Sequence, residues 1–200
     1  MKKPTNHNLK KEFLANFLFN KYPSVVTQSC RLPRAQALRK GSIIDIETTG
    51  LDPNFDNIIA IGILERNIAK VHQLTKPHYV SFKRYCQRKT EGSPKPRYAY
   101  AAGFEQDFLN VQHGLLADWE DLTQYKERQG YDWNSKDYDT YIRLHLDQCT
   151  LTPFHEPDIL SREVPNYWQA WLNDRKPKNL WSISYHCLCD LLRERQLVKR

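Results

Sequence analysis

The sequence predicts an α/β fold in which three antiparallel strands come first and helices then alternate with strands, giving a mixed sheet flanked by helices. Three short runs rich in β-branched or alternating apolar residues lie close together, at 42–47, 57–65 and 68–74. Only Arg66-Asn67 separates the last two runs, and so short a link suits an antiparallel meander. We therefore divide the chain into a basic helical extension at 1–41 and one α/β domain at 42–200.

The N-terminal extension is marked by its charge. Residues 1–41 hold nine Lys and Arg residues against one acidic residue, Glu12, a net charge of +8, whereas the whole chain carries +7. Apolar residues at helical spacing predict an amphipathic helix from Leu9 to Tyr22, and 24–41 is expected to be a basic connector. This asymmetry favours a polyanionic partner, although a merely solubilising surface has the same composition.

The segment 75–97 interrupts the strand pattern with seven Lys and Arg residues against one acid. Three aromatic residues are interleaved with these charges: Tyr79, Phe82 and Tyr85. Such a mixture suits a strand of nucleic acid, because charges hold phosphates and rings stack on bases. The alternative is a solvated helix and loop whose rings point into the core. On the first interpretation, Lys83 and Arg84 are candidate substrate-binding residues.

The rest of the chain alternates between strand-like and helix-like segments. In order, we expect a strand at 98–102, a helix from Gly103 through Leu115, a strand at 119–125, and helices at 141–149, 164–172 and 179–197. A polar insertion at 126–140 and a loop at 150–164 separate them. Pro165 suits the first turn of its helix, because that turn leaves the backbone N–H groups unpaired.

Composition argues against a membrane protein and indicates a reducing environment. No apolar run approaches the ~20 residues of a membrane span. The five cysteines are odd in number and irregularly spaced, which is typical of free thiols rather than of a disulfide framework. We therefore expect a cytoplasmic location in which the thiols stay reduced.

The most informative stretch is Ser42 to Leu51, S-I-I-D-I-E-T-T-G-L. Residues i and i+2 of a strand point to the same side, so Asp45 and Glu47 emerge together from a run of isoleucines that indicates burial. Two like charges on a buried strand are costly unless a positive charge lies between them. A hard divalent cation such as Mg²⁺ or Mn²⁺ is the natural occupant. An edge strand with both acids in solvent is the alternative.

The segment D-I-E-T-T-G-L resembles the first motif of the DEDD (DnaQ-like) 3′–5′ exonucleases, whose fold is ribonuclease-H-like. The resemblance implies two further motifs downstream. One places an Asp after a later strand. The other places a final Asp on a late helix, shortly after a His or Tyr.

The second motif is identified in Y-A-A-G-F-E-Q-D, Tyr100 to Asp107. It resembles the motif of the YprB-type branch, with alanine where the branch has asparagine and glutamine where it has phenylalanine. Asp107 is the acid that the alignment of the motif selects. If Asp107 does not serve, Glu105 or Asp121 is the substitute.

The third motif is H-C-L-C-D, His186 to Asp190, which resembles the H-N-x-x-D of the same branch. Residues i and i+4 share one face of a helix, so His186 and Asp190 can address one site. Tyr185 stands five residues before Asp190 and is the alternative to His186.

The resemblance implies that two divalent cations, Mg²⁺ or Mn²⁺, are held by four carboxylates: Asp45, Glu47, Asp107 and Asp190. Asp45 would bridge both ions, and His186 would take the proton from the attacking water. Thr48 and Leu51 would contact the terminal nucleotide. The released product would be a nucleoside 5′-monophosphate.

The expected function is therefore a metal-dependent 3′–5′ exonuclease on single-stranded DNA or RNA, with little sequence specificity because no base-reading motif is present. Two alternatives stay open. The departures in the second motif are compatible with a nucleic-acid-binding module whose catalysis is weak or absent. Related folds also cut internally, which leaves a structure-selective ribonuclease-H-like endonuclease.

Overall fold

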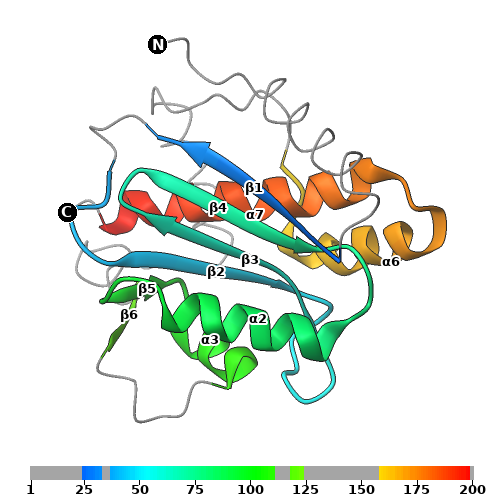
Figure 1. The fold of residues 1–200 in the computed structure, drawn as a ribbon, viewed down its shortest axis with the longest axis horizontal. Helices are drawn as coiled ribbons and strands as arrows, with labels where there is room; N and C mark the ends of the chain where they lie inside the picture. The colour runs from blue at the N-terminus through cyan, green and yellow to red at the C-terminus, as the bar shows by residue number, and fades with distance from the viewer. Residues whose placement is uncertain (1–23, 33–36, 111–117, 124–157, 199–200) are drawn as a thin grey trace.

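A six-stranded sheet forms the centre of the protein (Figure 1). The computed structural model describes residues 24–32, 37–110, 118–123 and 158–198. The strands lie in the order β1-β4-β3-β2-β5-β6. Their bounds are β1 Val25–Arg31, β2 Ser42–Thr48, β3 Ile58–Glu65, β4 Ile68–Leu74, β5 Arg97–Ala99 and β6 Trp119–Asp121.

The sheet is mixed, as the sequence predicts. Strands β2, β3 and β4 form the expected antiparallel meander. Strand β5 then pairs in parallel with β2, and β6 pairs in parallel with β5. Both are shorter than the predicted strands at 98–102 and 119–125. Strands β2 and β3 are buried along nearly their whole length, because helices cover both faces and the isoleucines therefore contact apolar neighbours on each side.

Strand β1 corrects the expectation of a connector at 24–41. Residues Val25–Arg31 pair antiparallel with β4 and form the outer edge of the sheet. Alternate residues of β1 are buried, among them Val26, Gln28 and Cys30. This part of the proposed extension therefore belongs to the sheet, and the division of the chain after residue 41 remains a proposal.

Helices cover the two faces of the sheet unequally (Figure 1). Helix α2 (Tyr79–Glu91) lies in front of the sheet in this view, and α6 (Val164–Asp174) and α7 (Pro177–Val198) lie behind it. Helix α7 packs along β2, β3 and β4. The short α3 (Ala102–Leu109) follows β5, and a single 3₁₀ turn, η3 (Ser161–Glu163), leads into α6. The helices expected at 164–172 and 179–197 are confirmed as α6 and α7.

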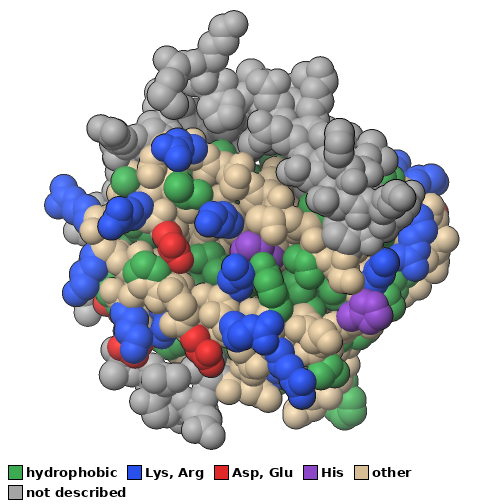
Figure 2. Space-filling model, viewed as in Figure 1, with side chains coloured by type: hydrophobic (Ala, Val, Ile, Leu, Met, Phe, Trp, Pro, Cys, Tyr) green, Lys and Arg blue, Asp and Glu red, His purple; other side chains and the backbone are tan. Residues whose placement is uncertain are grey.

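Helix α2 decides between the two interpretations of the basic segment 75–97. Phe82 is buried, and Tyr79 and Tyr85 pack against the core. The three rings therefore pack toward the core, as the second interpretation expects. The basic side chains of α2 contribute to a face rich in Lys and Arg (Figure 2). Buried Arg97 donates to the carbonyl oxygens of Thr90 and Glu91 and so fixes the end of α2 to β5.

Three expectations lie outside the described residues: the helices at 9–22 and 141–149 and the polar insertion at 126–140. The helix expected from Gly103 through Leu115 is described as far as Asn110, where α3 has ended. In the part of the chain that the structure describes, no helix is long and apolar enough to cross a membrane.

Candidate metal centre

Strand β2 places Asp45 and Glu47 side by side on the face of the sheet that α7 covers. Asp45 lies opposite Gly62 of β3, and Glu47 lies opposite Ala60. Both carboxylates are buried, at 8% and 5% exposure. Gly62 has no side chain to hold α7 away, and a Cβ there would lie 2.7 Å from the Cys187 Sγ atom. The helix therefore approaches the strand closely where the two acids emerge.

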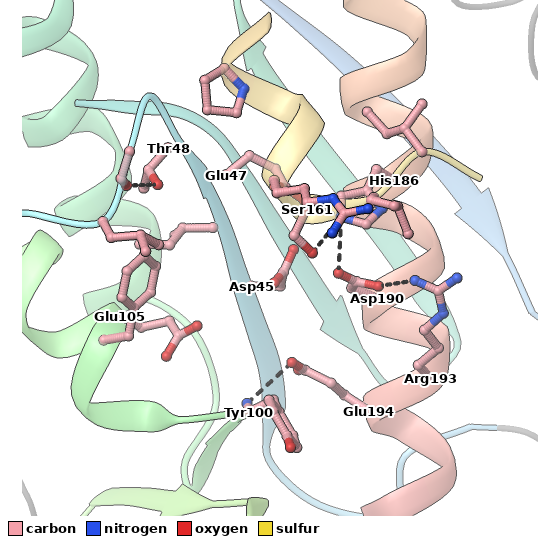
Figure 3. A pocket seen from close by; sticks show the side chains of 18 residues that line it. Asp45, Glu47, Thr48, Tyr100, Glu105, Ser161, His186, Asp190, Arg193 and Glu194 are labelled. Carbon is pink, nitrogen blue, oxygen red and sulfur yellow. Dashed lines mark hydrogen bonds and ion pairs between the residues drawn. The ribbon is translucent and has the colours of Figure 1, made fainter. Parts of the chain in front are cut away.

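Helix α7 brings His186 and Asp190 to these acids (Figure 3). The Nε2 atom of His186 lies 3.5 Å from Oδ2 of Asp190 and 4.0 Å from Oε1 of Glu47. Among the described residues, two groups offer ligand atoms that all lie within 4.8 Å of one another: Asp45 with Glu47 and Cys187, and Glu47 with His186 and Asp190.

The buried acids carry a large electrostatic cost. Burial, followed by the charge of Asp190, raises the pKa of Asp45 to about 7. Burial likewise raises the pKa of Glu47 well above its usual range. Oδ2 of Asp45 and Oε1 of Glu47 have no hydrogen-bond partner among the described residues. Buried oxygens without partners that face a shared space fit a hard divalent cation, which takes carboxylate ligands.

Polar neighbours hold His186 in a fixed orientation. Its Nδ1 atom lies 3.0 Å from Oδ1 of Asp158, and Nε2 lies 3.0 Å from the hydroxyl of Ser161. Burial alone would lower the pKa of His186, but Asp190, Glu47 and Asp158 together outweigh burial and raise the pKa to about 11. In this arrangement His186 is a cation that partly neutralises the surrounding acids.

Arg193 links the groups around His186. Its guanidinium forms an ion pair with Asp158, with Nη2 2.7 Å from Oδ2, and donates a hydrogen bond to Oδ1 of Asp190. Burial would raise the pKa of Asp158, but the hydrogen bond and charge of His186 hold it below the usual range. Neither Asp158 nor Arg193 belongs to a predicted motif. Asp158 is far from His186 in the sequence, so their contact cannot be recognised from spacing.

In the second motif, Glu105 and not the expected Asp107 places its carboxylate in the pocket. Asp107 is exposed and does not line the pocket, whereas Glu105 is 3% exposed and does. Two residues along a helix differ by about 200°, so only one of the two acids can face β2. The other substitute considered, Asp121, ends β6 and bonds to Thr123 nearby. The structure thus brings Glu105 to Asp45, Glu47 and Asp190 and leaves Asp107 outside.

A pocket of about 620 Å³ opens beside these acids. Thr48 and Leu51 line it, in keeping with their expected contact to a terminal nucleotide, and Tyr100 and Phe104 add apolar surface. Glu194, which no motif marked, also lines it. The signal for Glu194 is its spacing, because it follows Asp190 by four residues and so shares a helix face with it.

Lys83 and Arg84 lie away from this pocket. Both belong to α2, which covers the opposite face of the sheet from α7 (Figure 1). Lys83 donates to the side chain of Asn110 at the end of α3, at 3.2 Å. Neither residue can contact a ligand at Asp45 directly, so any role in substrate binding is confined to a more distant part of a long strand.

Comparison with known proteins gives one family. The model of the RNase H superfamily matches residues 42–200. No curated protein sequence matches the chain. The match covers the meander, the acids of β2 and the whole of α7.

Proposed function

Because the chain belongs to the RNase H superfamily, we propose that it is a metal-dependent 3′–5′ exonuclease of the DEDD type. It would hydrolyse phosphodiester bonds of single-stranded DNA or RNA and release nucleoside 5′-monophosphates. The observation that carries the proposal is the convergence of Asp45, Glu47 and Asp190 on one pocket, where Asp45 and Glu47 each hold a buried oxygen without a partner among the described residues. Nucleases of this superfamily use divalent metals, and this donor set suits Mg²⁺ or Mn²⁺.

Four carboxylates would hold the cations: Asp45, Glu47, Glu105 and Asp190. Glu105 replaces the Asp107 that the sequence selects, because only Glu105 faces the pocket. When bound, two divalent cations neutralise the phosphate and activate a water molecule. The chain places the carboxylates of Asp45 and Glu47 together on a rigid central strand, so their positions need no rearrangement on binding.

His186 is the proposed proton acceptor. Its Nε2 atom faces the acids, and Asp158 fixes the ring through Nδ1. Asp190, Glu47 and Asp158 all raise the pKa of His186, so cations bound to Asp190 and Glu47 would remove two of these three causes and lower the pKa. The imidazole can then accept a proton near neutral pH.

The pocket supports action at a chain end. Its volume of about 620 Å³ lies within the range of small-ligand sites, which suits a terminal nucleotide better than a duplex. Leu51 and Phe104 provide apolar surface for a base or sugar, and Arg162 adds a positive charge at the same pocket. These features favour an exonuclease over an enzyme that cuts internally.

The test compares end-labelled linear strands with circular single strands, in DNA and RNA versions, with Mn²⁺ or Mg²⁺. Degradation of the linear strands alone, with mononucleotide products, is the expected result. Cutting of circles would replace the proposal with an endonuclease. Binding without products would replace it with a nucleic-acid-binding module.

A further inference from the structure

Glu194 has a geometry that a purely structural residue does not require. It lies one helical turn after Asp190 on α7, is 3% exposed and lines the pocket. Its Oε1 atom accepts the backbone N–H of Tyr100 at 3.1 Å. Its Oε2 atom has no hydrogen-bond partner in the part of the chain that the structure describes. One oxygen is therefore anchored, and the other is buried without a partner.

Two further carboxylate oxygens near Glu194 are also buried without a hydrogen-bond partner among the described residues. They are Oδ2 of Asp45 and Oε2 of Glu105. The three side chains come from β2, α3 and α7, and Figure 3 shows them directed into the space between these elements. Burial raises the pKa of Glu194 well above its usual range, and the charges of Asp45 and Glu105 raise it further.

This space differs from the position next to His186. Both tight ligand groups among the described residues contain Glu47, and neither contains Glu105 or Glu194. Asp45 belongs to one of those groups and also faces Glu105 and Glu194. The ligand atoms of Asp45, Glu105 and Glu194 do not all lie within 4.8 Å of one another, so a cation between them would keep bound water in part of its shell, as Mg²⁺ commonly does in proteins. Such a cation would occupy a second position, with Asp45 shared between the two.

We propose that Glu194 is a fifth carboxylate of the metal centre and that, with Asp45 and Glu105, it holds the second divalent cation. The proposal rests on the metal centre of the proposed function. The hydrogen bond from Tyr100 gives Glu194 a second effect. Tyr100 directly precedes the left-handed residue Ala101 (φ 60°) at the start of α3, so Glu194 also fixes the helix that carries Glu105.

The experiment measures Mn²⁺ binding to the full chain without substrate, by calorimetry and by electron paramagnetic resonance. We expect two ions in the wild type. Glu194→Gln should keep the tighter ion within about threefold and weaken the second at least tenfold, because a neutral amide is a poor ligand. The amide oxygen can still accept the Tyr100 N–H, so the fold is preserved. Glu91→Gln, on the exposed end of α2, removes the same charge and should bind both ions normally.

A second variant keeps the test decisive. Glu105→Gln should reproduce the selective loss of the weaker ion, and this result does not depend on the tether to Tyr100. Normal binding of both ions by Glu194→Gln would overturn the proposal and leave the proposed function intact. A wild type that binds one ion would also overturn it. A wild type that binds none would instead contradict the metal centre of the proposed function.

Discussion

At the scale of single residues, Asp45 carries an electrostatic cost in the metal-free protein that a bound cation would offset. Its pKa of about 7, raised by burial and then by Asp190, means that ionisation in the metal-free protein is unfavourable. The contribution of Asp45 to stability is therefore highest at low pH and is lost as the pH rises from the ordinary pKa of 3.8 through about 7. Cation binding competes with this proton, so Mn²⁺ affinity should rise over the same range.

We predict that Asp45→Asn lowers nuclease activity by at least about 10³-fold and stabilises the metal-free protein. At pH 8 the free energy of unfolding should increase by about 1–3 kcal/mol, because one pKa unit corresponds to ~1.4 kcal/mol. Urea unfolding in chelator, followed by circular dichroism, measures the second effect. Activity close to wild type, or a less stable variant, would contradict the assignment.

Glu105 and Asp107 give a paired prediction about the second motif. Glu105→Gln should reduce turnover by about 10²-fold or more, because this carboxylate lines the pocket. Asp107→Asn should change turnover by less than about threefold, because surface substitutions away from a site have small effects. Initial rates on a labelled oligonucleotide compare the two directly. The opposite order would restore Asp107 as the ligand.

His186 and Tyr185 differ in the direction of their side chains. His186 faces Glu47 and Asp190, whereas Tyr185 is buried and stacks on Trp181 at 5.8 Å between ring centres. We predict that His186→Ala lowers kcat by about 10²–10⁴-fold and that Tyr185→Phe has little effect. Single-turnover kinetics with saturating Mn²⁺ would measure the rates of both variants against the wild type. A larger loss in Tyr185→Phe would indicate a tyrosine-based mechanism.

At the scale of elements, the sequence reveals segments with strong periodicity and hides those whose pattern is mixed. The isoleucines of β2 and β3 identify a buried meander, and the spacing of His186 and Asp190 identifies one face of α7. Strand β1 is hidden because its inward positions include polar Gln28. Helix α2 is hidden because only one narrow stripe of it is buried, beneath many charges.

The choice between Glu105 and Asp107 shows why the site is only partly predictable. The two acids differ only in helical phase, and that phase depends on where α3 begins. Ala101 adopts a left-handed conformation there, which is uncommon for a residue with a side chain. Nothing in the local sequence requires it. Contacts such as that of Asp158 with His186 depend on the assembled fold and carry no local signal.

His72 provides a prediction at the junction of β1, β4 and α2. Its Nδ1 atom contacts the hydroxyl of Thr27 at 2.8 Å and that of Tyr85 at 3.0 Å. Burial lowers the pKa of His72 from 6.5 to about 4, assisted by Lys89 and Lys70. The unfolded chain therefore takes up a proton first as the pH falls, and stability is lost between pH 6.5 and 4.

We predict that this histidine costs the wild type about 1–2 kcal/mol of unfolding free energy between pH 7 and 5. His72→Gln, which cannot titrate, should lose less stability than the wild type over that range. Urea titrations at the two pH values give the difference. Equal pH dependence in both proteins would show that His72 titrates normally in the fold.

At the scale of the whole molecule, the basic side chains of α2 lie apart from the acidic site. The acids converge on the α7 side of the sheet, whereas α2 carries basic side chains on the other face (Figure 2). The N-terminal residues 1–22 add five lysines and one acid, a net charge of +4. A long polyanion can therefore contact the basic side chains of α2 on the face of the sheet opposite the acidic pocket, which would otherwise repel it.

Deletion of residues 1–22 should weaken binding of single-stranded oligonucleotides and flatten the dependence of log K on log salt by up to about 3, since each lost contact contributes ~0.7. The cut must leave β1 intact, because Val25–Arg31 pairs with β4. Fluorescence anisotropy at several salt concentrations, with catalysis blocked by Asp45→Asn, measures the slope. An unchanged slope would show that these lysines do not contact the ligand.

Gly62 contributes no ligand, but it determines how closely α7 approaches the sheet at the metal centre. Side chains of α7 contact the bare backbone of β3 at this position, so the helix has no room to move nearer to the sheet. Folding thereby fixes the distance between Asp45 and Asp190. Cations of different radius would then bind between carboxylates at the same separation. Selection among metals would then depend on how well an ion fits a fixed gap and not on how far the protein yields to it.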